Sequence, residues 1–143
     1  MSLITEDALK KQISAASFAP AYLLCGEDGY LKKLYFDRIA EKAVDGDPFF
    51  NLADFSGDCE LQEVYDAVVQ YPVMSERKCV RLTDYDFEHA SAADFDRLCA
   101  ILGEATEGCV LILRFESVPF DTSSKKGGRG KKILAALDKS GGV

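Results

Sequence analysis

Short apolar runs alternate with amphipathic segments along this chain, and that alternation constrains the fold more than any other feature. The runs are Ala21 to Cys25, Phe49 to Phe55, Lys78 to Leu82 and Cys109 to Leu113. Apolar residues at helical spacing predict helices over about residues 6–16, 29–44, 60–70, 92–102 and 133–139. Strands that alternate with helices favour right-handed crossovers. The chain is therefore predicted to be a three-layer α/β domain, with a parallel sheet covered by helices on both faces.

Length and composition fit one globular domain. The 143 residues, 48% hydrophobic and 29% charged, are enough for a real core and too apolar for general disorder. No apolar run approaches the roughly 20 residues of a membrane helix, and the N-terminus lacks the plan of a signal peptide. We expect a cytoplasmic protein without a membrane partner.

The charged residues and cysteines exclude several kinds of site. The formal charge of −7 should repel the phosphate backbone of DNA from the domain as a whole. The five cysteines form no C-x-x-C pair, which argues against a zinc site and against a disulfide framework. We interpret them as reduced thiols that pack mostly as small hydrophobes.

The turn after the first predicted strand is where a phosphate-binding loop would lie in such a fold. It reads Gly26-Glu27-Asp28-Gly29. The Gly-Lys-Ser/Thr of a phosphate loop is missing, and two carboxylates would face a triphosphate. We interpret the segment as a degenerate phosphate loop, a tight turn with Asp28 capping the next helix, and predict no bound cofactor.

Candidate catalytic residues are few. His89 is the only histidine, and no G-x-S-x-G elbow is present, so no triad can be assembled. Asp84, Asp86 and Glu88 follow the third predicted strand, where a metal site is conceivable, but a solvated acidic loop is favoured. The sequence predicts no catalytic and no metal-binding residues.

Residues 121–132 form a glycine-rich basic segment in which the basic residues run from Lys125 to Lys132. We predict a flexible loop before a last helix, Ile133 to Lys139, and a local contact with DNA stays an alternative. Because Gly141-Gly142-Val143 stands where a further strand could start, the natural protein is expected to continue.

The segment from Tyr71 to Lys78 has apolar residues in the connection between a predicted helix and a predicted strand. Pro72 disfavours helical geometry at Tyr71, and Val73 and Met74 follow it. Two interpretations stay open: Val73 and Met74 tuck into the core, or they form an exposed anchor for a partner.

Several segments together resemble the delta subunit family of bacterial DNA polymerase III. The resemblance runs in order over nearly the whole chain, through Ala21 to Leu31, Phe55 to Gly57, Pro72 to Lys78 and Lys131 to Leu137. It implies that residues 1–143 are the N-terminal AAA+-like domain of a longer clamp-loader subunit, without the C-terminal lid and collar domains. It also implies a domain that has lost ATP binding.

The resemblance further implies that Val73 and Met74, flanked by Tyr71 and Pro72, enter a hydrophobic pocket on the sliding clamp (the beta subunit). This pair is smaller than the Leu/Phe or Phe/Phe pairs common in the family, so less apolar area is available for burial. The other implied partners are the gamma/tau and delta prime subunits, with DNA contacted through the assembled complex. The domain would catalyse nothing by itself while belonging to a DNA-directed DNA polymerase holoenzyme.

Two other functions remain as alternatives at this point. A P-loop-type nucleotide-binding enzyme domain would have to bind ATP without the usual lysine motif. A DNA-binding module acting through Lys125 to Lys132 would show strongly salt-dependent affinity for DNA.

Overall fold

A computed structural model gives the fold of the chain. The structure describes residues 5–25, 29–44, 47–57, 59–74, 76–103, 108–116 and 128–140, although the side chains at positions 48, 49 and 138–140 are outside this description. None of the helices in these ranges is long and apolar enough to cross a membrane.

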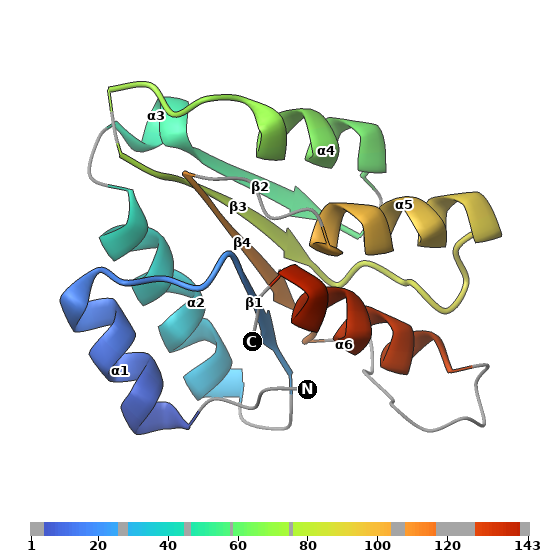
Figure 1. Cartoon of the computed structure of the whole chain (residues 1–143), viewed down its shortest axis with the longest axis horizontal. Helices are drawn as coiled ribbons and strands as arrows, with labels where there is room; N and C mark the ends of the chain where they lie inside the picture. Colours follow the sequence, from blue (N-terminus) through green and yellow to red (C-terminus); the bar gives the residue numbers. More distant parts are fainter. Residues whose placement is uncertain are drawn as a thin grey trace.

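The centre of the molecule is a four-stranded parallel sheet in the order β1-β4-β3-β2 (Figure 1). The strands are β1 (Ala21–Leu24), β2 (Leu52–Ser56), β3 (Lys78–Thr83) and β4 (Cys109–Arg114). In the register of the two central strands Val80 lies opposite Leu111, and both side chains are buried. Most residues of these two strands are buried because helices cover the sheet on both faces.

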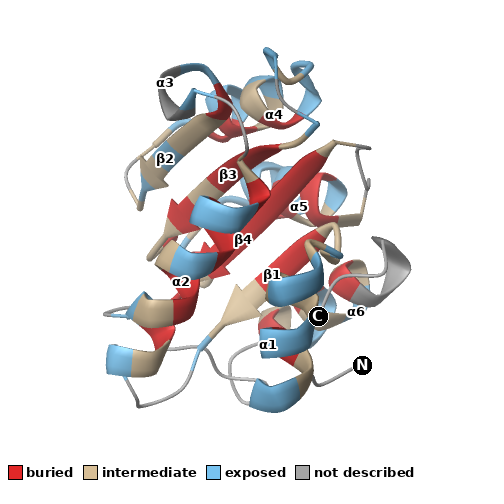
Figure 2. Cartoon of the chain, turned by 90° about the vertical axis from the view of Figure 1, so that its left-hand side faces the viewer, coloured by how far each residue is buried: buried red, intermediate tan, exposed pale blue. Residues whose placement is uncertain are grey.

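Helices form the two outer layers. One face of the sheet carries α1 (Glu6–Ala15) and α2 (Gly29–Ala43), and the other carries α4 (Leu61–Val69), α5 (Ala92–Gly103) and α6 (Arg129–Ser140) (Figures 1 and 2). The predicted three-layer α/β fold is therefore confirmed. Thr5 Oγ1 accepts from Ala8 N at 3.1 Å, and Ser91 Oγ accepts from Asp94 N at the same distance, so side chains cap the starts of α1 and α5.

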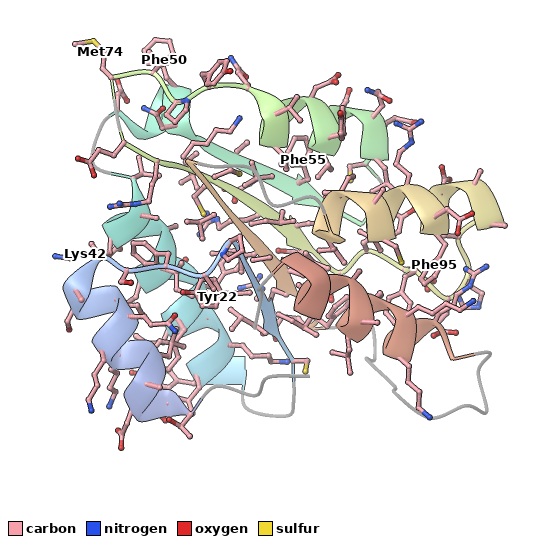
Figure 3. The ribbon with its side chains drawn as sticks, in the orientation of Figure 1. Tyr22, Lys42, Phe50, Phe55, Met74 and Phe95 are labelled. Carbon is pink, nitrogen blue, oxygen red and sulfur yellow. The ribbon has the colours of Figure 1, made fainter. Side chains whose placement is uncertain are left out.

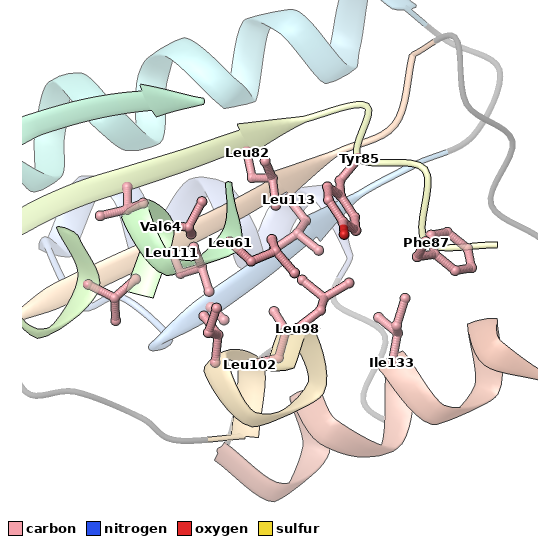
Figure 4. Close-up of a cluster of buried hydrophobic side chains, with 14 of the residues drawn as sticks. Leu61, Val64, Leu82, Tyr85, Phe87, Leu98, Leu102, Leu111, Leu113 and Ile133 are labelled. Carbon is pink, nitrogen blue, oxygen red and sulfur yellow. The ribbon is translucent and has the colours of Figure 1, made fainter. Parts of the chain in front are cut away.

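The hydrophobic core has a separate cluster on each side of the sheet. The larger cluster joins α4, α5 and α6 to the sheet, and Figure 4 shows Leu61, Leu98 and Ile133 converging on it from the three helices. The smaller cluster packs Tyr35 and Ile39 of α2 against Ile112 of β4. The central strands of the sheet are consequently buried on both faces, as the sequence predicts.

Two predicted element boundaries are wrong. The aromatic run from Phe49 to Phe55 is predicted to be one strand, but Pro48–Asn51 form the short helix α3 before β2. Proline favours the first position of a helix, and the Asn51 backbone N–H donates to the Asp47 carbonyl at 3.1 Å. The last helix begins at Arg129 instead of Ile133, so the end of the predicted flexible loop is helical; residues 121–127 lie outside the described part.

Gly57 allows the ends of β2 and β3 to approach each other closely. A Cβ atom at Gly57 would lie 2.2 Å from the carbonyl oxygen of Asp84, which is far inside contact distance. Asp84 itself has a left-handed φ of 57° and donates its N–H to the Arg114 carbonyl. The Phe55-Ser56-Gly57 segment thus has a structural reason to end in glycine.

Candidate functional site: an exposed apolar loop at the amino edge of the sheet

The exposed loop, residues 70–74, is part of the connection between α4 and β3. Helix α4 ends at Val69 because Gln70 is extended, and Pro72 disfavours helical geometry at the residue before it. Since the strands are parallel, the start of β3 places this loop at the amino edge of the sheet, beside α3 (Figure 1).

The loop exposes its apolar side chains to solvent. Met74 is 96% exposed, Tyr71 87% and Val73 40%, while Pro72 is half-buried. Phe50 of α3 is also exposed, and Figure 3 shows it at the same corner of the molecule as Met74, whose side chain projects away from the ribbon. Of the two open interpretations, burial of Met74 in the core is therefore wrong.

Asn51 holds the backbone of the loop. Its side chain is only 2% exposed, and its Oδ1 accepts from Val73 N at 2.7 Å while its Nδ2 donates to Val73 O at 2.8 Å. The Nδ2 also donates to Asp47 O at 3.0 Å. Sequence reasoning missed this residue, because the predicted strand over residues 49–55 left no reason for a buried amide there.

Further contacts fix both ends of the loop. Pro72 lies against Gly108, where a Cβ atom would come 3.4 Å from Pro72 Cγ. After the loop, Arg77 Nε donates to the Ala43 carbonyl at 3.2 Å, and the buried Lys78 ammonium donates to the Ala67 carbonyl in α4. Burial lowers the pKa of Lys78. The backbone that carries the exposed apolar side chains is thus held in place at both ends of the loop.

The opposite, carboxyl edge of the sheet carries the predicted degenerate phosphate loop. Gly26, Glu27 and Asp28 lie outside the described residues, and Gly29 begins α2. The buried Lys32 ammonium of α2 donates to the Phe115 carbonyl at 2.9 Å and lies 3.6 Å from the Glu116 carboxylate. Glu116 also lies beside Gly29, at the start of α2. An ion pair between Lys32 and Glu116 therefore lies at the start of α2, the helix end at which phosphate-binding folds place an anion.

Three of the other residues considered for chemistry, Asp84, Asp86 and His89, make hydrogen bonds or ion pairs within the domain. Asp84 Oδ1 accepts from Glu116 N at 2.7 Å. His89 is 85% exposed at its side chain, and its Nδ1 lies 2.6 Å from Asp86 Oδ2. Among the described residues no group of three or more His, Cys, Asp or Glu side chains could hold a metal ion.

Two of the five cysteines, Cys79 and Cys109, lie in the central strands and are buried. Burial raises the pKa of Cys79 to about 12 and that of Cys109 to about 11, so both remain neutral thiols in the core. This confirms the prediction of small hydrophobes for these two residues. Cys25 differs, because it is exposed.

One residue of the basic segment, Arg129, makes contacts within the folded domain. One Arg129 guanidinium nitrogen, Nη1, donates to the carbonyls of Phe87 at 2.6 Å and Ala90 at 2.8 Å, and the guanidinium stacks over the Phe95 ring. Lys131 and Lys132 are exposed on α6. Arg129 consequently anchors α6 to the segment between β3 and α5.

The fold and the exposed loop together define a parallel α/β domain that presents apolar side chains at the amino edge of its sheet. A family model described as DNA polymerase III, delta subunit, matches residues 22–140. The chain belongs to the DNA polymerase III delta subunit family. No curated protein matches the sequence.

Solved structures share the fold. The chain is similar to the DNA clamp loader delta protein of Bacillus subtilis, with a TM-score of 0.72 and 22% identity over 92% of this chain and 39% of that one. It is also similar to a DNA polymerase III gamma subunit-related protein of Thermotoga maritima, with a TM-score of 0.62 and 16% identity over 94% of this chain and 44% of that one. The chain thus spans about two fifths of the length of these proteins.

Proposed function

We propose that this domain binds the sliding clamp through Val73 and Met74, here called the anchor pair, with Tyr71 and Pro72 flanking it. The observation that carries the proposal is that Met74 is almost fully exposed on a loop whose backbone is held by Asn51, Arg77 and Lys78. An exposed methionine that serves no core is suited to an apolar pocket of imperfect shape. Membership of the delta subunit family supports a clamp as the partner.

The size of the anchor pair sets the expected strength. Full burial of a valine or methionine side chain contributes about 1.5–3 kcal/mol, and Val73 is already partly covered, so most of the gain would come from Met74. Tyr71 can add apolar area at the rim of the contact. We therefore expect modest affinity for the isolated domain.

The domain would act as a clamp-opening wedge within a larger loader. A binding partner shifts a closed ring toward the open state only if it binds the open state more tightly, so the anchor pair must favour a distorted clamp interface. In this proposal gamma/tau and delta prime are further partners, and the ATPase subunits of the loader control access of this domain to the clamp. The delta domain catalyses no reaction itself, DNA is contacted by the assembled complex, and the protein works in the cytoplasm.

The first test measures binding of the chain to the sliding clamp of the same cell by calorimetry. The double variant Val73→Ala/Met74→Ala is expected to lose at least tenfold in affinity, about 1.4 kcal/mol, because most of the buried apolar area disappears. The matched control is Tyr30→Ala, which removes an aromatic side chain that is 75% exposed at the start of α2, away from the loop.

The two variants separate the outcomes. Loss of affinity in the double variant, with Tyr30→Ala unchanged, supports the anchor pair. Equal affinity of the double variant and the unaltered chain would refute it.

A further inference from the structure

Asn51 makes a two-point contact with the backbone of Val73, the first residue of the anchor pair. Its Oδ1 accepts a hydrogen bond from the Val73 N–H, and its Nδ2 donates a hydrogen bond to the Val73 carbonyl. A neighbouring β-strand would satisfy a residue in the same way, through both of its backbone groups. The amide therefore takes the place of a strand partner for a residue that has none in the sheet.

The next residue shows why such support is needed. Met74 has a left-handed φ of 52°, which a residue with a Cβ atom rarely adopts. Its side chain is 96% exposed, so no core packing of that side chain offsets the strained backbone. The conformation that presents Met74 must be stabilised by neighbouring residues, and the residue just before it, Val73, has both of its backbone groups bonded to Asn51.

Asn51 is itself rigidly placed. It is the last residue of α3, its side chain is 2% exposed, and its Nδ2 is shared with the carbonyl of Asp47 one turn earlier. Rotating the amide away from Val73 would bury a donor and an acceptor without these partners, which is unfavourable. A buried, fully engaged amide at the base of an exposed loop is well suited to holding that loop in one shape.

We propose that Asn51 is a positioning residue that preorganises the anchor pair for the apolar pocket of the clamp. This inference rests on the proposed function, because it concerns the same contact. A loop that adopts its binding shape for only a fraction of the time binds more weakly by that fraction. The hydrogen bonds from Asn51 to Val73 keep most molecules in the binding conformation of the loop before the clamp binds.

The test compares clamp affinity for Asn51→Ala and Ser91→Ala in the chain. Asn51→Ala is expected to weaken clamp binding by about tenfold, since the loop loses both bonds to Val73. Ser91→Ala is the control, because it also removes a side-chain bond to the backbone, at the start of α5, and leaves the loop intact. Binding is measured well below the thermal midpoint of both variants.

A second measurement needs no variant. In the unaltered protein the Val73 amide, although it lies in an exposed loop, is expected to exchange its hydrogen with solvent at least about tenfold more slowly than an unstructured amide. Exchange at the unstructured rate would overturn the inference even if Asn51→Ala failed to fold.

The outcomes distinguish this inference from the proposed function. Weaker binding of Asn51→Ala with unchanged Ser91→Ala supports the positioning role. If the unaltered chain and Asn51→Ala bind the clamp equally well, the positioning role is wrong and the anchor pair stands. If the unaltered chain does not bind the clamp at all, both are wrong.

Discussion

At the scale of single residues, a few polar or small residues determine how segments that are distant in the sequence pack together. Gly57 lets β2 close onto Asp84, Lys32 pairs with Glu116 at the carboxyl edge, and Asn51 holds Val73 at the amino edge. None of these contacts follows from hydropathy. Each depends on a partner that lies far away in the sequence and near in the fold.

The Gly57 contact predicts a strong response to one methyl group. Gly57→Ala would place Cβ against the Asp84 backbone, which must shift, so stability should fall by about 1–3 kcal/mol. Gly29→Ala is the control, because its Cβ would meet only the Glu116 side chain at 3.4 Å and should change stability by less than about 1 kcal/mol. Urea unfolding measures both, and equal midpoints for the two variants would contradict the close approach.

At the scale of elements, the sequence predicts helix α3 and the start of helix α6 least well. The aromatic pair Phe49-Phe50 favours a strand by propensity, yet Pro48 and the bond from Asn51 to Asp47 make the segment helical. Glycines around Arg129 favour a loop, yet three carbonyls in the segment between β3 and α5 accept from its guanidinium. At α3 a proline and a local helical hydrogen bond outweigh strand propensity, whereas at α6 the tertiary contacts of Arg129 outweigh the local preference for a loop.

The start of α6 therefore depends on Arg129. Arg129→Ala is expected to lower the free energy of unfolding by about 1.5–3 kcal/mol, because it removes charged hydrogen bonds to Phe87 and Ala90 and the stacking on Phe95. The exposed neighbour Lys131→Ala should change it by less than about 0.5 kcal/mol. Chemical denaturation of both variants decides, and an Arg129→Ala variant as stable as Lys131→Ala would show that α6 is not anchored in this way.

At the scale of the whole molecule, the two edges of the sheet have different characters. The carboxyl edge, where ligands usually bind in parallel α/β folds, holds the internal Lys32–Glu116 pair. The amino edge presents the exposed loop with Tyr71, Val73 and Met74. The proposed function therefore uses the edge that this architecture does not normally use for small ligands.

The layers and the position of the exposed loop could be predicted from the sequence, because apolar runs, helical spacing and Pro72 are local signals. The runs in β3 and β4 are mostly buried, as predicted. The exposure of Met74 could not be predicted, since an apolar residue in a connection can equally be buried. The contact of Asn51 with Val73 could not be predicted either, because it depends on α3, and residue propensities predict a strand there. The binding of the anchor pair to a clamp remains a prediction.

One measurement tests that binding most directly. The chain has two methionines, Met1 and Met74, so a sample labelled at the methionine methyl groups gives two NMR signals. On addition of unlabelled sliding clamp, the Met74 methyl, identified through Met74→Leu, is expected to shift or broaden as it leaves water for an apolar pocket. A complex that forms while the Met74 signal stays at its free position would contradict the account.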